Sequence, residues 1–267
     1  TVHFQRRFYE NRIKTRPDLA ERVLVQDVDD AQANEEKQKL LNDNIKYMKE
    51  HGSRKVRTRI RATIKAKKEF EEVGRKVRVH LPVPKICQQV DHIEILASSP
   101  EITCIAPENA PQRTVCFETE LQPDQEFMVE YTYDYHVNYV ELDPAEAAFK
   151  QPDFCLEEQA PHIMFTPFLR ELRDELVGDE TNPIIMARKF YDFVTTKIMY
   201  SYMREYFTID CIPEYCAVNQ KGDCGVQALL FITLCRMSGI PARWQTGLYV
   251  TEFDAGCHDC AQFYVEP

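Results

Sequence analysis

The middle of the chain alternates between hydrophobic and polar residues, which is the pattern of β-strands. From Arg54 the apolar side chains fall on every second position, and the positions between them carry many arginines and lysines. The same period recurs in residues 75–81, 93–97, 114–120 and 126–140. Side chains alternate between the faces of a strand, so each segment predicts a strand with one buried face. Because no helical segment separates them, the sequence predicts an antiparallel β-sandwich domain over residues 54–150.

Helical spacing of apolar positions is found on both sides of this β-rich part. Residues 35–49 have high helix propensity with apolar residues on one side, so residues 1–53 are expected to form a helical N-terminal arm. Thr166 and Asn182 each stand directly before a proline. A capping side chain followed by proline in the first turn predicts the start of a helix, and two helices are therefore expected after residue 150.

A third helix is predicted from Cys224 to Met237, because apolar residues there recur at helical spacing and a stop signal of Gly239 and Pro241 follows. Apolar side chains occupy most of its circumference, so we expect a buried helix. A helix N-terminus carries unpaired N–H groups and a partial positive charge, which favour a thiolate and can hold an oxyanion. Cys224 is therefore a candidate nucleophile, with a small buried core cysteine as the alternative.

Two strands are predicted after this helix, over residues 240–250 and 258–265, and together they indicate a hairpin. His258 begins the second strand, and alternation places Asp259 on the opposite face. A thiol and an imidazole within hydrogen-bond reach form an activated nucleophile, in which histidine takes the thiol proton and later protonates the leaving amine. We therefore predict that His258 lies beside Cys224.

These motifs resemble the transglutaminase-like superfamily, whose members carry a papain-like Cys-His-Asp core. The resemblance is carried, in order, by Lys221-Gly222-Asp223-Cys224-Gly225, by Gly239-Ile240-Pro241-Ala242-Arg243 and by His258 on a strand. It is specific from about residue 181, and is closer still to bacterial transglutaminase-like proteins regarded as cysteine proteases with a β-rich domain in front.

The resemblance implies an α+β fold with a papain-like catalytic domain over residues 151–267. It implies Cys224 as nucleophile and His258 as general base. It also implies an aromatic residue near the oxyanion site, for which Tyr200 is the candidate together with Gly225; core packing is the alternative for Tyr200.

Two departures from the family pattern affect the expected site. The family usually has an aromatic residue two positions after the histidine, where this chain has Cys260. The family's aspartate lies on the strand after the histidine strand, so we expect the third catalytic residue beyond Pro267, in a longer protein. Asp259 is not expected to replace it, because its side chain points away from the face that carries His258.

A zinc site is the main alternative interpretation of the cysteines. Cys257 and Cys260 frame His258 in a C-x-x-C pattern, and Cys211 and Cys216 form a second pair, so that four thiolates could surround zinc. The second pair lacks the tight spacing typical of zinc knuckles, and a metal would compete with Cys224 for the histidine. We therefore expect no metal and no cofactor.

Composition narrows the remaining possibilities. The 267 residues include 33 basic and 43 acidic side chains, and the net charge of −10 argues against nucleic-acid binding. No stretch approaches 18 apolar residues, so no membrane span is expected. Ten scattered cysteines and a reactive thiol favour the cytoplasm. The sequence thus predicts acyl transfer on amide bonds of a protein or peptide, most simply hydrolysis, with transfer to an amine or a non-catalytic peptide- or glycan-binding scaffold as alternatives.

Overall fold

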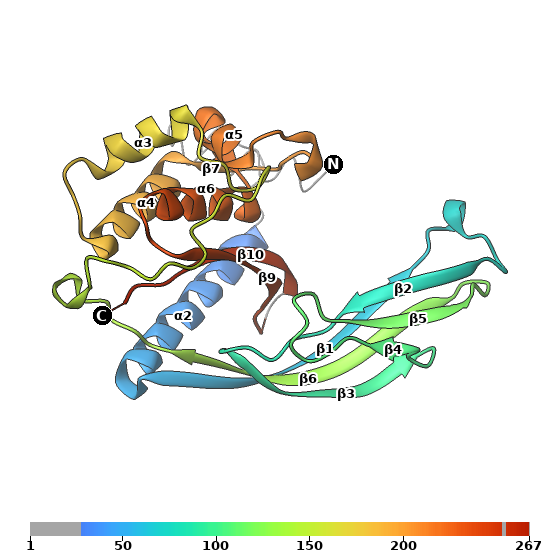
Figure 1. Cartoon of the computed structure of the whole chain (residues 1–267). Helices are drawn as coiled ribbons and strands as arrows, with labels where there is room; N and C mark the ends of the chain where they lie inside the picture. Colours follow the sequence, from blue (N-terminus) through green and yellow to red (C-terminus); the bar gives the residue numbers. More distant parts are fainter. Residues whose placement is uncertain (1–27, 253–254, 267) are drawn as a thin grey trace. The chain divides into compact units, whose positions relative to one another are not determined.

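The computed structural model describes residues 28–252 and 255–266, and it combines helices with antiparallel sheets (Figure 1). These residues form two compact units, one of residues 35–140 and one of residues 28–34 and 141–266. The α+β class predicted from the sequence is confirmed. Helix α2 (Val28–His51) forms most of the described part of the predicted N-terminal arm, whose last residue, Ser53, already begins the first strand. Residues 1–27 of that arm lie outside the described residues.

The first unit contains two three-stranded antiparallel sheets. One has the order β1-β6-β3, formed by β1 (Ser53–Lys65), β6 (Glu126–Asn138) and β3 (Val90–Ser99). The other has the order β2-β5-β4, formed by β2 (Lys76–Pro82), β5 (Thr114–Glu120) and β4 (Cys104–Ile105). Both sheets supply side chains to one hydrophobic core, in which the rings of Phe117 and Phe127 are 5.6 Å apart. The inner faces therefore pack as a sandwich.

Several basic side chains of β1 form ion pairs with acidic side chains of β6. Arg57 is paired in register with Asp134, and its Nε donates to Oδ1 at 2.6 Å. Lys55 Nζ lies 2.9 Å from the other carboxylate oxygen. The Asp134 residue is only 4% exposed, so these two cations compensate a buried charge.

The second unit combines four helices with a short hairpin that packs against α6 (Figure 1). The helices are α3 (Pro167–Val177), α4 (Pro183–Lys197), α5 (Ile212–Asn219) and α6 (Cys224–Met237). The hairpin consists of β9 (Ala242–Val250) and β10 (Ala255–Phe263), and a two-residue parallel pair is formed by β7 (Met199–Tyr200) and β8 (Lys221–Gly222). Short 3-10 helices are formed by Pro144–Glu146 and Tyr206–Thr208 in this unit and by Lys68–Phe70 in the first unit.

Helices α3 and α4 begin where the sequence predicts, and each has a capping side chain. Thr166 Oγ1 accepts from the backbone N–H of Leu169 at 3.3 Å, and Asn182 Oδ1 accepts from that of Ile184 at 3.0 Å. Each side chain satisfies an N–H group that has no partner within its helix.

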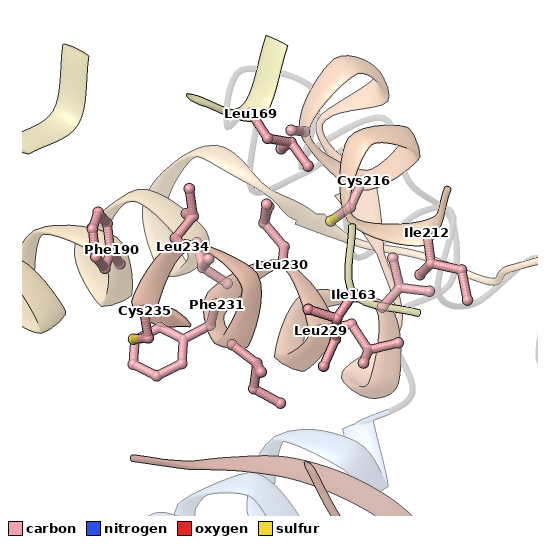
Figure 2. Close-up of a cluster of buried hydrophobic side chains, with 14 of the residues drawn as sticks. Ile163, Leu169, Phe190, Ile212, Cys216, Leu229, Leu230, Phe231, Leu234 and Cys235 are labelled. Carbon is pink, nitrogen blue, oxygen red and sulfur yellow. The ribbon is translucent and has the colours of Figure 1, made fainter. Parts of the chain in front are cut away.

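Helix α6 is the centre of this unit, and Figure 2 shows its side chains packed among those of its neighbours. Leu229, Leu230 and Leu234 are fully buried, next to Phe190 of α4 and Ile212 of α5. The hairpin covers another side of α6, where the rings of Phe231 and Phe263 are 5.9 Å apart. Close packing of this kind holds the helix, and with it the first turn that carries Cys224, in a fixed position. No helix among the described residues has the length and apolarity needed to cross a membrane.

Candidate active site

Cys224 is the first residue of α6, as the sequence predicts, and its side chain is half-buried. Asp223 precedes it as the helix cap, and its Oδ1 accepts from the backbone N–H of Val226 at 3.1 Å. Gly222 is packed so closely that a β-carbon there would lie 2.7 Å from Cγ1 of Val226. The turn into the helix is thus tightly constrained, and it presents the thiol at the positive end of a buried helix.

The hairpin brings a carboxylate to this thiol. Ala261 and Phe263 of β10 pack against the core around α6, and Asp259 lies two positions earlier on the same face of the strand. Its Oδ2 is 4.0 Å from the Sγ of Cys224, which is within the range of a weak hydrogen bond from sulfur. The expectation that Asp259 points away from the thiol is therefore wrong.

His258 lies on the other face of the hairpin. It pairs with Gly247 across the two strands, its side chain is exposed, and its ring stands edge-on to that of Tyr249 with the centroids 6.2 Å apart. The structure thus brings Cys224 together with Asp259 rather than with His258. The physical reason is that the apolar residues of β10 point to the face opposite His258. Burying them against α6 places His258 on the outer face. The catalytic roles of Cys224 and His258 stay predictions.

An aromatic residue does lie at the start of α6, but it is Tyr206. Its hydroxyl donates to Oδ1 of Asp223 at 2.5 Å. Tyr200, the sequence candidate, pairs through its backbone with Gly222, and the N–H of Ser201 donates to the Gly222 carbonyl at 3.1 Å. Tyr200 therefore supports the strand before Cys224. Sequence reasoning could not separate Tyr206 from the neighbouring aromatic residues, because its hydrogen bond to Asp223 spans 17 positions along the chain.

Gly225, the other predicted positioning residue, is buried directly after the nucleophile. The hydroxyl of Tyr206 and Oδ2 of Asp259 both lie within 2.9 Å of the place that a β-carbon on residue 225 would take. Burial, followed by the hydrogen bond to Asp223, raises the pKa of Tyr206. The phenol therefore keeps its proton over the whole physiological pH range.

The environments of the other cysteines differ from that of Cys224. Burial raises the pKa of Cys216 to about 12, and burial alone raises the pKa of Cys235. The pKa of Cys260 is also raised, first by burial and then by the negative charges of Asp259 and Cys224. These three thiols are poor nucleophiles because the thiolate is the reactive form.

The four cysteines considered for zinc are not gathered into one site. Cys257 and Cys260 lie three positions apart on a regular strand and so face opposite sides of it. Cys216 is fully buried in the hydrophobic core, and Cys211 directly precedes the first residue of α5. Within the described residues, one cysteine pair therefore lies on a strand and the other at the start of a helix, and neither forms a zinc knuckle.

One group of possible metal ligands does converge in the described part of the chain, in the first unit. It consists of Asp91, His92 and Asp134, whose ligand atoms lie within 4.8 Å of one another. Asp134 is already paired with Lys55 and Arg57. Because a cation would have to displace these side chains, we assign no metal to the group.

Comparison with known proteins agrees with the arrangement of the second unit. Residues 170–267 match the model of the transglutaminase-like superfamily. No curated protein shows a match to the chain. One solved structure that resembles it is described as a "putative cysteine protease" from Cytophaga hutchinsonii, with 17% identity, a TM-score of 0.59, and coverage of 80% of this chain and 75% of that one. This likeness concerns the fold, whereas the match of residues 170–267 also covers Cys224 and the hairpin. The similarity of this chain to the transglutaminase-like superfamily thus lies in residues 170–267.

Proposed function

We propose that the protein is a thiol-dependent enzyme that cleaves amide bonds in a peptide or protein through a thioester on Cys224. The observation that carries the proposal is the position of Cys224 as the first residue of a buried, capped helix within a transglutaminase-like domain. The similarity in fold to a protein described as a cysteine protease supports the same chemistry.

The proposed reaction has two steps. The thiolate of Cys224 attacks the carbonyl carbon, and the N–H groups at the start of α6 face the oxyanion that forms. The C–N bond then breaks, the amine leaves with the proton taken from the thiol, and an acyl thioester remains on the sulfur. Water attacks the thioester, giving a carboxylic acid and the free thiol. A primary amine in place of water would give a new amide by the same route.

The base in this proposal is His258. An imidazole titrates near neutral pH and can both accept the thiol proton and return it, whereas a carboxylate is far too weak a base for a thiol. The family resemblance gives His258 the same role. The pairing requires the imidazole to reach the face of the hairpin that Asp259 occupies here, beside Cys224.

A second candidate function is a non-catalytic domain that binds a peptide. The observation that favours it is that the residue beside the thiol is Asp259, while His258 lies on the opposite face of β10. A thiol that lies beside a carboxylate, with no imidazole on the same face of the strand, lacks a general base.

The test compares the purified chain with Cys224→Ser on an activated ester and on peptide anilides, with and without a primary amine. We expect the substitution to lower acyl transfer at least about a hundredfold, because it removes the nucleophile. Cys104→Ser, at an exposed cysteine of the first unit, serves as the matched control and should leave the rate unchanged. Equal activity of Cys224→Ser and the native chain would contradict the enzyme. A native chain that accepts no acyl group on Cys224 would favour the binding domain.

A further inference from the structure

Tyr206 is linked to the nucleophile through the cap of α6. The Tyr206 hydroxyl donates to Oδ1 of Asp223, and the same oxygen accepts the backbone N–H of Val226. One carboxylate oxygen thus joins the phenol to the first turn of the helix. A hydrogen bond to a charged oxygen is stronger than one between neutral groups, so the phenol strongly favours a single orientation of the cap.

The same hydroxyl covers the residue after the nucleophile. A β-carbon on Gly225 would lie 2.4 Å from the hydroxyl oxygen and 3.2 Å from Cε2 of the same ring. Contacts this short cannot persist, so the phenol and any side chain at residue 225 exclude each other. The absence of a side chain at Gly225 therefore allows Tyr206 to reach Asp223.

The phenol is unsuited to act as the oxyanion donor in this arrangement. A tyrosine hydroxyl has one hydrogen, and here that hydrogen is directed to Asp223. Tyr202 and Phe207, its aromatic neighbours, are 62% and 86% exposed, whereas Tyr206 packs partly against the core of the unit. Tyr206 is thus held in place by the core and can in turn hold the side chain of Asp223.

From this geometry we propose that Tyr206 is a positioning residue of the Cys224 site. By holding Asp223 in its capping orientation, it orders the N–H groups of the first turn of α6, and these N–H groups stabilise the Cys224 thiolate. The proposal rests on the function proposed above for Cys224, but it concerns the state of the thiol and can be measured without turnover.

The experiment follows alkylation of Cys224 by iodoacetamide as a function of pH, in the native chain and in Tyr206→Phe. Removing a charge-assisted hydrogen bond should lower the rate at neutral pH by roughly tenfold or more and move the profile to higher pH. Tyr191→Phe, at an exposed tyrosine of α4, is the matched control and should leave the profile unchanged. A purely structural role would lower the melting temperature of Tyr206→Phe without moving its pH profile, and that result would overturn the proposal.

Gly225→Ala provides a second measurement that keeps the phenol. Its β-carbon must push the hydroxyl away from Asp223 and also meets Oδ2 of Asp259, so the variants are compared in chains that carry Asp259→Asn, in which no charge is displaced. There Gly225→Ala should reproduce the slower alkylation of Tyr206→Phe. The double variant should lose less of the alkylation rate than the product of the two separate losses, because both substitutions break the same hydrogen bond. Independent effects would contradict the proposal. A chain that turns over no substrate but shows this coupling would refute the proposed function while supporting the role of Tyr206.

Discussion

The Sγ of Cys224 and the Oδ2 of Asp259 lie 4.0 Å apart, and His258, the adjacent residue of β10, has its side chain on the opposite face of the strand. A carboxylate at this place would lie beside the negative charge of the attacking sulfur, and like charges repel each other. Asp259 should therefore lower the reactivity of Cys224, whereas His258 should raise it.

Asp259→Asn is expected to increase the reactivity of Cys224. The amide removes the negative charge beside the thiol while keeping the size of the side chain, so alkylation at pH 7 should become about three- to tenfold faster. The rate constant for iodoacetamide, followed by mass spectrometry of the Cys224 peptide, measures the change. Asp192→Asn on the exposed side of α4 is the control. Slower alkylation in Asp259→Asn would mean that the carboxylate assists the thiol, contrary to this account.

His258→Ala is expected to lower acylation by an activated substrate about a hundredfold or more, because the base that accepts the thiol proton is lost. Stopped-flow measurement of the first turnover isolates this step. His80→Ala removes an exposed histidine of the first unit, whose ring is hydrogen-bonded to Thr114, and should have no effect. Unchanged acylation in His258→Ala would place the base elsewhere.

Limited alkylation should distinguish Cys224 from the buried thiols. Burial raises the pKa of Cys216 from 9.0 to about 12, which corresponds to an approximately thousandfold smaller thiolate fraction at a given pH. Cys216 and Cys235 should therefore react only after unfolding, whereas Cys224 is labelled first in the folded chain. Peptide mapping after substoichiometric iodoacetamide gives the order. Labelling of Cys257 or Cys260 with Cys224 untouched is the result that this account excludes.

Lowering the pH should reduce the free energy of unfolding of the first unit, because Asp134 becomes protonated. Arg57, and then Lys55, hold the pKa of this carboxyl well below its ordinary value. Its contribution to the free energy of unfolding is thus fully present above about pH 4 and is lost as the pH falls towards the folded-state pKa. The difference in stability between the native chain and Asp134→Asn should shrink over this range in urea unfolding followed by circular dichroism.

Asp124→Asn provides the comparison for Asp134. Lys68 and Lys65 also lower the pKa of Asp124, but its side chain is 59% exposed. Solvent screens such a pair, so its acid dependence should be smaller than that of Asp134. An equal dependence would contradict the importance that we give to the buried position of Asp134.

Local signals in the sequence were sufficient where a segment's structure depends on its own residues. The strand over residues 114–120 follows from alternation, and the helix starts at Thr166 and Asn182 follow from a capping side chain before proline. Helix α5 was not predicted. Pro213 stands in the first turn of this helix of eight residues, a position that proline favours.

The candidate site depended on a contact that alternation cannot supply. Alternation places His258 and Asp259 on opposite faces, but it does not say which face meets α6. That choice follows from the burial of Ala261 and Phe263 against the helix, which is a property of the packed unit. Tyr206 escaped prediction for a similar reason, since its hydrogen bond to Asp223 spans 17 positions along the chain.

In the proposed reaction, the acyl group is carried by the sulfur of Cys224. The most direct measurement is rapid acid quenching of the chain during reaction with an activated acyl donor, followed by peptide mapping by mass spectrometry. We expect an adduct of the acyl mass on the peptide that contains Cys224. Neutral hydroxylamine should remove it, as it removes a thioester, and it should be absent in Cys224→Ser. Product formation with the adduct on another cysteine, or with no adduct on Cys224, would contradict it.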